Sequence, residues 1–275
     1  MKSITCKGQL ISLETPIIMG ILNLTPDSFY DGGKYRDENT ILNQTALMDA
    51  EGATFIDLGA YSSRPGADDI SEEEELRRLM PVIELLLENF PSLLLSIDTF
   101  RANVARRAIK AGATLINDIS AGNLDENMLP TIAELQVPYI MMHMRGTPQT
   151  MKTLTHYDHL VKEVLFYFSE RVASARALGI NDLIIDPGFG FAKTIVQNFE
   201  LLHRLELFKT LDLPLLAGLS RKSTIYKTLN IEPNEALNGT TVLNTIALMK
   251  GASILRVHDV KPAMEAVTLL DKLPK

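Results

Sequence analysis

The sequence predicts a (β/α)8 TIM barrel of the α/β class, preceded by an N-terminal β-hairpin. The chain has 275 residues, and short apolar runs alternate with longer amphipathic ones along its whole length, in about eight strand–helix units. A barrel of this kind takes about 250 residues. An open doubly wound sheet also alternates, but about eight units in this length favour closure. We therefore expect residues 1–275 to form a single barrel domain.

Eight apolar runs have the length of β-strands and are almost continuously hydrophobic. Parallel strands that are buried on both faces have this composition. Residues Lys2–Glu14 precede the first run and are predicted to form the hairpin, which would plug the bottom of the barrel. The eight runs are Ile17–Leu22, Phe55–Leu58, Leu93–Ile97, Leu115–Ile119, Tyr139–Met142, Leu183–Ile185, Leu213–Ala217 and Ile254–Val257.

The stretch Ser71–Asn89 is the clearest predicted helix. Ser71 followed by Glu74 indicates a capping box, and the acidic run Glu72–Glu75 suits the positive end of a helix dipole. Apolar residues then recur at helical spacing. The other predicted helices are Thr40–Glu51, Ala102–Ala111, Tyr157–Leu178, Ala236–Lys250 and Pro262–Lys272.

A short repeat lies between helix and strand at three points of the chain. The segments Glu51–Thr54, Ala111–Thr114 and Lys250–Ser253 each contain Gly followed by Ala. Glycine readily adopts the left-handed conformation that ends a helix. We expect each of these glycines to end its helix, with the alanine leading tightly into the next strand.

Composition excludes several classes of protein. The formal net charge is -7 with no basic block, which argues against a nucleic-acid partner. Cys6 is the only cysteine, so an internal disulfide is impossible and a reducing, cytoplasmic location is expected. The segment Met1–Gly8 lacks the apolar core of a signal peptide, and no run of about 18 apolar residues predicts a membrane span.

Polar residues follow all eight apolar runs. In a (β/α)8 barrel the carboxyl ends of the strands gather at one mouth, where the active site lies. One polar residue after a strand is usually a cap or a turn, but eight of eight indicate a polar site. These exits carry Asn23, Asp57, Asp98, Asn117–Asp118, His143, Asp186, Ser220–Lys222 and Arg256–His258.

The side chains predicted at the mouth divide by chemistry into two groups. One offers carboxylate and amide edges, which suit a planar heterocycle with N–H donors. It comprises Asp98, Asn117 and Asp186. The other offers positive charge and suits a phosphate or diphosphate. It comprises Arg64, Lys222, Arg256 and His258. The predicted ligand is therefore a nitrogen heterocycle that carries phosphate.

Two long connections follow the first two predicted strands. Residues 23–33 end in paired glycines, and residues 61–69 carry Arg64 between hydroxyl side chains and a Pro-Gly pair. Loops of this length in a barrel often act as lids over the site. We expect both to close over the polar mouth.

At these positions the chain resembles the dihydropteroate synthase family of pterin-binding barrel enzymes. The resemblance follows the order of the family's motifs over nearly the whole chain. The matching stretches are Met19–Phe29, Ser62–Gly66, Ser96–Thr99, Ile116–Asp118, Met142–Pro148, Asp186–Phe191, Gly218–Lys222 and Arg256–His258.

The resemblance implies an activity in folate biosynthesis. Such a transferase condenses 6-hydroxymethyl-7,8-dihydropterin diphosphate with 4-aminobenzoate, releasing 7,8-dihydropteroate and diphosphate, and it uses Mg²⁺. It also implies a homodimer formed through the last helices, and an enzyme that sulfonamides target.

The resemblance further implies roles for the matching residues. The pterin would be held by Asp98, Asn117, Asp186, Lys222, Met141 and Phe191. The diphosphate would be held by Asn23, Arg64, Arg256 and His258, with Asn23 also close to Mg²⁺. The 4-aminobenzoate pocket and its covering loops would contain Thr25, Pro26, Phe29, Ser63, Pro65 and Ser220, with Gly218 as a further substrate contact. The catalytic set would be Asp98, Arg64, Lys222, Arg256 and His258.

The chain departs from the family pattern in two places. Residues Gly59–Ser63 read Gly-Ala-Tyr-Ser-Ser, where many members have Gly-Gly-Glu-Ser-Thr, and Arg145 stands where Gln is common. Neither change removes a charged group that the chemistry needs. His143 fits a buried structural histidine as well as a catalytic one.

Two other functions are compatible with a pterin-binding barrel. The first is a methyltransferase domain that passes a methyl group from methyltetrahydrofolate to a corrinoid partner. The second is a non-catalytic family member that serves as a binding subunit. Three features argue against the first, because methyl transfer involves no diphosphate: the Ser63–Gly66 loop, Lys222 and the Arg256–His258 pair. No pterin or diphosphate contact is plainly missing, which argues against the second.

Overall fold

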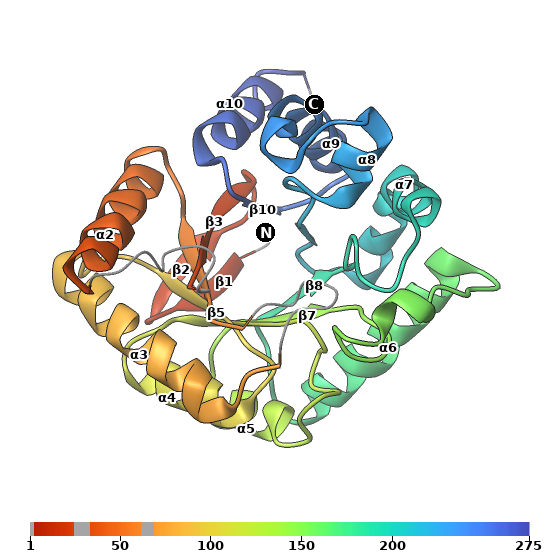
Figure 1. The fold of residues 1–275 in the computed structure, drawn as a ribbon. Coiled ribbons are helices and arrows are strands. Elements are labelled where there is room, and N and C mark those ends of the chain that lie inside the picture. Colours follow the sequence, from red (N-terminus) through yellow and green to blue (C-terminus); the bar gives the residue numbers. More distant parts are fainter. Residues whose placement is uncertain (1–2, 25–33, 62–68, 275) are drawn as a thin grey trace.

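The computed structural model describes residues 3–24, 34–61 and 69–274 (Figure 1). Its centre is an eight-stranded parallel sheet in the order β8-β7-β6-β5-β4-β3-β10-β9. The strands are β3 (Ile17–Asn23), β4 (Phe55–Gly59), β5 (Leu95–Asp98), β6 (Leu115–Asp118), β7 (Tyr139–Met142), β8 (Leu183–Asp186), β9 (Leu216–Ala217) and β10 (Ile254–Val257). A parallel bridge between Ile185 and Leu215 joins the two ends of this order. The predicted (β/α)8 barrel is confirmed.

Helices surround the barrel on its outer side (Figure 1). They are α2 (Lys34–Ala50), α3 (Glu72–Asn89), α4 (Ala102–Lys110), α5 (Met128–Leu135), α6 (Leu160–Ala177), α7 (Ile195–His203), α8 (Ser223–Leu229), α9 (Leu237–Met249) and α10 (Val260–Leu270). Short 3-10 turns occur at η1 (Met151–Thr153), η2 (Leu205–Leu211) and η3 (Pro233–Glu235). In the ranges that the structure covers, no helix is both long and apolar enough to cross a membrane.

The start of α3 confirms half of the predicted capping box. The Ser71 Oγ accepts a hydrogen bond from the Glu74 backbone N–H at 3.2 Å, which satisfies one free donor of the first turn. The reciprocal bond, in which the Glu74 carboxylate would accept from the Ser71 backbone N–H, is replaced by ion pairs to Arg77 at 2.7 Å and Arg78 at 2.6 Å. The capping-box prediction was wrong in this respect because two arginines one turn along the helix attract the same carboxylate.

The three glycines of the short repeat have positive φ, as predicted. Their φ values are 97° at Gly52, 111° at Gly112 and 102° at Gly251. This left-handed backbone is unstrained for glycine and ends α2, α4 and α9 just before the next strand.

The bottom of the barrel is closed by the hairpin of β1 (Ser3–Cys6) and β2 (Gln9–Ser12), which pair antiparallel. Ile4 and Cys6 pack in one buried cluster with Met19, Phe55 and other residues from the amino ends of the barrel strands. The Thr5 N–H donates to Asp182 Oδ2 at 3.2 Å. The predicted hairpin plug is confirmed, and burial, helped by Asp182, raises the pKa of the Cys6 thiol to about 12.

Side chains along each strand alternate between the barrel interior and the helix layer. On β4, Phe55 belongs to the interior cluster at the bottom, whereas Ile56 and Leu58 belong to the large cluster beneath the helices. Asp57 therefore faces inward. The same alternation on the other strands decides which polar residues reach the mouth.

Candidate active site

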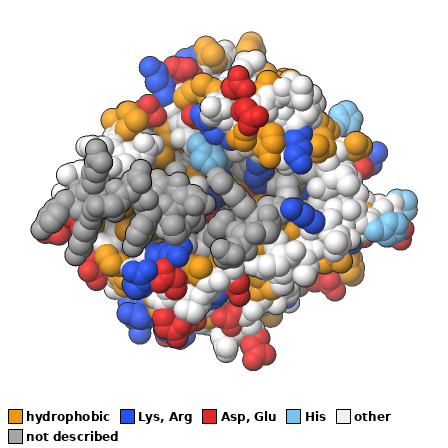
Figure 2. Space-filling model, in the orientation of Figure 1, with side chains coloured by type: hydrophobic (Ala, Val, Ile, Leu, Met, Phe, Trp, Pro, Cys, Tyr) orange, Lys and Arg blue, Asp and Glu red, His pale blue; other side chains and the backbone are white. Residues whose placement is uncertain are grey.

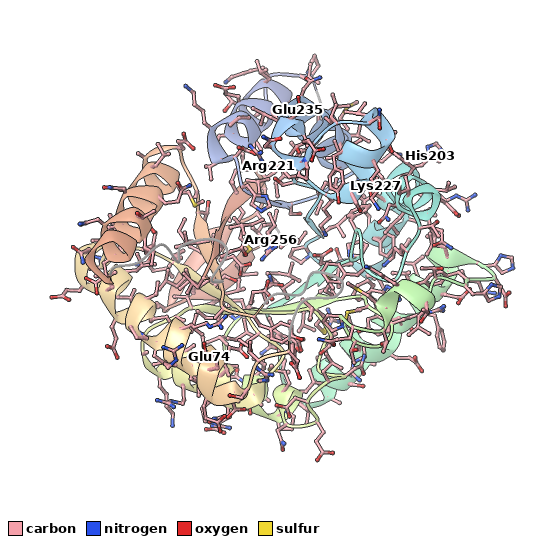
Figure 3. The ribbon with its side chains drawn as sticks, viewed as in Figure 1. Glu74, His203, Arg221, Lys227, Glu235 and Arg256 are labelled. Carbon is pink, nitrogen blue, oxygen red and sulfur yellow. The ribbon has the colours of Figure 1, made fainter. Side chains whose placement is uncertain are left out.

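The inward-facing positions near the carboxyl ends of the strands carry polar side chains. They are Asn23 on β3, Asp57 on β4, Asp98 on β5, Asn117 on β6, Asp186 on β8 and Arg256 on β10. Across neighbouring strands Asn23 pairs in register with Gly59, and Asp98 pairs with Asn117. Arg256 lies near the barrel axis, whereas Glu74 and His203 lie on outer helices (Figure 3). In the same view, Figure 2 shows Lys, Arg and His side chains around the centre of this face.

Asp57 is the buried anchor of this mouth. Its side chain is fully buried, and its Oδ1 accepts from Ser96 Oγ at 2.5 Å. Its Oδ2 accepts from Asn117 Nδ2 at 3.1 Å and from Arg256 Nε at 2.6 Å. Because the Asn117 amide nitrogen is used in this way, its oxygen remains to accept from a ligand N–H. Asp57 therefore fixes the orientation of two predicted substrate contacts.

Arg256 also binds Asp98, so the two halves of the predicted site meet in one ion pair. Arg256 Nη2 lies 2.8 Å from Asp98 Oδ2. Burial raises the pKa of Asp98 to about 7, although the Arg256 charge opposes this rise. Burial also works against the guanidinium charge, but Asp57 and Asp98 together raise the pKa of Arg256. The arginine therefore stays charged between the two carboxylates.

Asp186 and Lys222 form the opposite side of the mouth. Asp186 Oδ1 accepts from the Gly188 N–H at 2.8 Å, and burial raises the pKa of the carboxyl. Lys222 Nζ donates to the Phe189 carbonyl and lies 4.8 Å from the centre of the Phe191 ring. Burial lowers the pKa of Lys222 to about 8, against the attraction of Asp186.

Gly218 leaves the space between Asp186 and Lys222 open. A Cβ atom at this position would lie 3.9 Å from both Asp186 Oδ2 and Lys222 Nζ. A larger residue would extend a side chain toward both groups. The glycine thus gives a flat ligand access to the carboxylate and the ammonium together.

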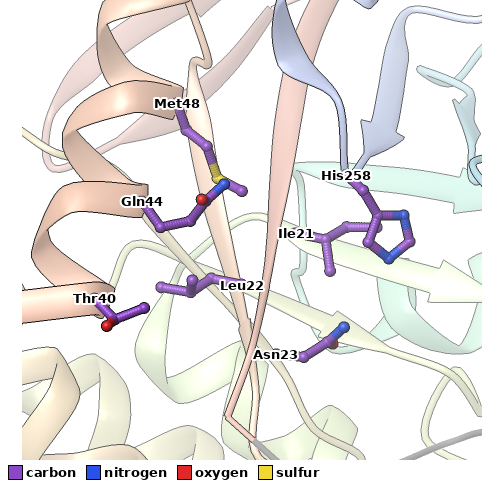
Figure 4. A pocket seen from close by; sticks show the side chains of 7 residues that line it. All are labelled: Ile21, Leu22, Asn23, Thr40, Gln44, Met48 and His258. Atoms are coloured by element: carbon purple, nitrogen blue, oxygen red, sulfur yellow. The ribbon is translucent and has the colours of Figure 1, made fainter. Parts of the chain in front are cut away.

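A cavity of about 210 Å³ lies beside Asn23 and His258. Thr40, Gln44 and Met48 of α2 line it from one side (Figure 4). The imidazole of His258 is held by Ser220, whose Oγ lies 3.0 Å from Nδ1 and accepts from the His258 backbone N–H at 3.2 Å. The predicted diphosphate end of the site therefore has open space next to it.

Several predicted site residues lie outside the described ranges. These are Thr25, Pro26, Phe29, Ser63, Arg64 and Pro65, which belong to the two connections predicted to be lids. Their predicted roles in binding diphosphate and 4-aminobenzoate remain predictions. The described residues include most of the predicted pterin contacts and the predicted diphosphate contacts Asn23, Arg256 and His258.

Met141 does not face the mouth, so its predicted contact with the pterin was wrong. It packs in the cluster beneath the helices and pairs in register with Ile185, which lies in the same outer cluster. Met142 instead pairs with Asp186 and packs near Phe191 at the mouth. A continuously apolar strand shows no alternation, so the sequence could not assign its faces.

The two departures from the family pattern have partners away from the polar mouth. The Tyr61 hydroxyl accepts from Gln149 Nε2 at 2.9 Å, and its ring packs edge-on against Phe100 at 5.1 Å. Arg145 pairs with Glu163 at 2.5 Å and lies 3.8 Å from the centre of the Tyr157 ring. Neither residue displaces Asp98, Asn117, Asp186 or Lys222.

The histidines on or near outer helices are exposed. His156, His159 and His203 lie at the surface. Asp118 points into the helix layer, where it accepts from Ser120 and Tyr139. It serves the loop after β6 as a structural carboxylate.

The mouth suits a magnesium ion only in part. Within residues 3–24, 34–61 and 69–274, no three His, Cys, Asp or Glu side chains are placed to hold a metal together. Mg²⁺ is commonly bound through one or two protein oxygens, several waters and the phosphates of a substrate. The Asn23 amide oxygen beside the cavity fits that mode, in which the diphosphate supplies most ligands.

One buried residue that contacts this site was not predicted. Lys193 ends the loop after β8 and is buried, with its Nζ among backbone carbonyls and the His143 ring. A single lysine in a loop is expected at the surface, because lysine side chains are almost never fully buried.

Comparison with known proteins agrees with this geometry. Residues 19–258 match the family model described as pterin binding enzyme. The chain is 43% identical over 267 residues to the dihydropteroate synthase of Escherichia coli K12, covering 96% of this chain and 94% of the relative. It superposes with a TM-score of 0.91 at 41% identity on the Yersinia pestis dihydropteroate synthase with a sulfonamide drug complex, covering 98% of both chains. The Xanthomonas albilineans dihydropteroate synthase with 4-aminobenzoic acid gives a TM-score of 0.91 at 40% identity and 99% coverage of both chains.

Proposed function

Because the chain belongs to the pterin-binding enzyme family and has the dihydropteroate synthase activity of its relatives, we propose which residues of its mouth bind the pterin and which bind the diphosphate. The bond from the pterin methylene carbon to the diphosphate oxygen breaks, and the amine nitrogen of 4-aminobenzoate then bonds to that carbon. The amine loses one proton, and diphosphate leaves. Residues 1–275 act in this reaction as one pterin-binding domain.

The pterin lies between Asp186 and Lys222 on one side and Asn117 and Asp98 on the other. Carboxylates accept from its ring N–H and amino groups, and the ammonium donates to a ring acceptor. The opening that Gly218 leaves admits the flat ring to both members of the first pair. Phe191 and Met142 provide apolar contact at the edge of the mouth.

The diphosphate lies toward Asn23, Arg256 and His258. Arg256 is held by Asp57, so its guanidinium is oriented before the substrate arrives. A guanidinium is suited to phosphate oxygens because it presents paired donors in one plane. Arg64, outside the described residues, is proposed to add a second cation at this end. Asn23 and the diphosphate itself would hold Mg²⁺, which would supply further positive charge for the leaving group.

The bond to diphosphate breaks ahead of attack by the amine. The electron-rich dihydropterin stabilises positive charge on its methylene carbon, and the carboxylate of Asp98 stabilises the same charge electrostatically. Arg256 and His258 stabilise the negative charge of the departing diphosphate. Excluding water from the mouth protects the cation from hydrolysis. No covalent nucleophile is needed, and Cys6 lies at the opposite end of the barrel.

The observation that carries this proposal is the convergence of Asp98, Asn117, Asp186, Lys222 and Arg256 on one mouth. The test is turnover of the purified protein with pterin diphosphate, 4-aminobenzoate and Mg²⁺, with dihydropteroate and diphosphate measured together. Equal amounts of both products are expected. Binding of pterin diphosphate without product would contradict the proposal and indicate a non-catalytic member of the family.

The enzyme is further proposed to be a cytoplasmic homodimer. The last helices carry exposed apolar side chains, including Val242 and Met249 on α9 and Leu269 on α10. Apolar side chains exposed on neighbouring helices would be covered by a second copy of the chain. The buried thiol of Cys6 is compatible with a reducing compartment. Light scattering coupled to size exclusion tests the dimer, for which a monomer mass would contradict the proposal.

A further inference from the structure

Lys193 is buried beneath the loop that joins β8 to α7. Its Nζ donates to the carbonyls of Gly188 and Phe191, at 3.0 Å each, and lies 3.0 Å from His143 Nδ1. Burial lowers the pKa of Lys193 to about 7, against the attraction of Asp186. In its protonated form the group has three N–H donors, and these three acceptors match them one to one. His143 then accepts at Nδ1 and carries its proton on Nε2. Burial, together with the Lys193 charge, holds the pKa of His143 well below its usual range, so the ring is neutral.

Each carbonyl bound by Lys193 belongs to a residue that shapes the pterin side of the mouth. Gly188 donates its own N–H to Asp186 Oδ1 at 2.8 Å. Phe191 places its ring 4.8 Å from Lys222 Nζ. Lys193 therefore contacts, through single residues, both the carboxylate and the ammonium proposed to hold the pterin.

Lys222 holds the same loop from the mouth side. Its Nζ donates to the carbonyl of Phe189, between the two carbonyls bound by Lys193. An ammonium has three N–H donors, so the Lys222 side chain that holds Phe189 can also donate to a pterin. The loop then depends on its other bonds to keep Asp186 and Phe191 in place as the ligand binds Lys222.

The remaining bonds hold the loop from outside. Besides those of Lys193, the Gly190 N–H donates to Asn198 at 2.7 Å, and the Tyr157 hydroxyl donates to the Ala192 carbonyl at 3.0 Å. A Cβ at Gly188 would lie 2.1 Å from the His143 carbonyl oxygen, so the loop is pressed directly against the residue that follows β7.

We propose that Lys193 is a positioning residue for the pterin, which keeps Asp186 and Phe191 in place while Lys222 donates to the substrate. The inference rests on the proposed function, since it assumes that Lys222 and Asp186 bind the pterin. It also assigns His143 a structural role, as a neutral acceptor for Lys193. The edge-on packing of His143 on Tyr167, with ring centres 4.8 Å apart, fixes the ring in that role.

The test is the variant Lys193→Met, which keeps the length of the side chain and removes its donors. Titration calorimetry with pterin diphosphate and Mg²⁺, without the amine, is expected to show a Kd raised by about tenfold. In steady state, KM for pterin diphosphate rises by a similar factor, and KM for 4-aminobenzoate changes less than about twofold. Lys250→Met, which removes a partly exposed lysine paired with Glu206 far from this loop, is the matched control and should leave all three values unchanged.

A purely structural role for Lys193 would give a different pattern. Loss of folded enzyme lowers kcat and the fraction of binding-competent protein but leaves the pterin Kd and KM unchanged, and that result overturns the inference. If Lys193→Met does not fold, Lys193→Gln, which keeps two N–H donors, is measured in its place with the same expected direction. Absence of wild-type turnover would contradict the proposed function itself, whereas wild-type turnover with an unchanged pterin Kd in the variant contradicts only the role of Lys193.

Discussion

The guanidinium of Arg256 lies 2.8 Å from the carboxylate of Asp98, across the two strands β3 and β4 that separate β10 from β5. The group proposed to receive the diphosphate thus contacts the group proposed to face the pterin cation. The negative charge of the leaving diphosphate would meet Arg256, and the positive charge of the pterin methylene would meet Asp98, both already in place. Preorganised charges of this kind lower a barrier because they need no reorientation as the bond breaks.

Replacing Asp98 by Asn is expected to remove most turnover while the fold survives. The amide keeps the shape of the side chain but loses the charge that stabilises the pterin cation. A loss of kcat of about 10²-fold or more is expected, by analogy with other electrostatic stabilisers. Formation of dihydropteroate measures turnover, and far-UV circular dichroism checks that the variant is folded. Near wild-type turnover in a folded Asp98→Asn variant would rule out the assigned role.

Replacing Asp57 by Asn is expected to destabilise the fold as well as the site. Asp57 is fully buried and accepts from Ser96, Asn117 and Arg256, so its loss leaves part of the Arg256 charge uncompensated. Breaking a buried ion pair typically costs about 3–5 kcal/mol of unfolding free energy. Urea unfolding measures this loss.

The control for the Asp57 experiment is Glu134→Gln, which breaks the exposed pair with Arg106. Exposed ion pairs contribute little because water screens them and both side chains lose freedom. The control should therefore change stability far less. Equal effects of the two variants would show that Asp57 is not the buried anchor described above.

The rate should depend on pH through Lys222 and Asp98. The pKa of Lys222 is lowered to about 8, so its cation is present below that pH and is lost as the pH rises through it. The pKa of Asp98 is raised to about 7, so its anion is present above that pH and is lost as the pH falls through it. The value of kcat/KM for pterin diphosphate is therefore expected to peak between these values.

The variant Lys222→Arg identifies the alkaline limb of this profile. A guanidinium stays protonated at every pH in the range, so the decline above about pH 8 should disappear even if the maximum rate is lower. A wild-type profile that is flat from about pH 6 to pH 9 would contradict both assignments.

Magnesium is expected to bind with the substrate and not before it. Since the described residues place no three acidic, His or Cys side chains together, the protein alone should show little heat on titration with Mg²⁺. Chelation by EDTA should abolish turnover, and added Mg²⁺ should restore it. Strong Mg²⁺ binding by the substrate-free protein would show that its site is built from residues other than Asn23 and the diphosphate.

Much of the barrel could be predicted because its strands and helix ends are marked by short stretches of sequence. Continuous apolar runs located seven of the eight strands closely, and positive-φ glycines marked the helix ends at Gly52, Gly112 and Gly251. The strand predicted from Leu213 is shorter, Leu216–Ala217, because the apolar residues before it belong to a bend that bridges to Ile185.

Three helices escaped prediction for physical reasons. Helix α8 spans only Ser223–Leu229, too short for a periodicity to emerge. Helix α5 contains Pro130 and has no side-chain cap at its start. Helix α7 begins with a complete capping box between Thr194 and Gln197, a signal that the sequence carries and that could have identified it.

The polar residues of the mouth were predicted better than the buried residues that hold them in position. Polar residues after strands indicated Asp98, Asn117, Asp186 and Arg256, because the strand ends alone determine where they gather. The inward or outward direction of Met141 and Met142 depends on register, which a continuous apolar run does not reveal. Lys193 acts through contacts formed only in the folded chain.

The closing bridge between Ile185 and Leu215 makes the β8–β9 junction a seam in the barrel wall. Asp186 stands on one side of it, with Gly218 and Lys222 on the other. A pterin bound by these residues would contact both sides of the seam and hold them together. In the free enzyme, amide hydrogens along β8 and β9 should therefore exchange with deuterium faster than those of β4 or β5. A bound ligand should slow the exchange of β8 and β9 most, because ligand binding stabilises the closed barrel at this junction.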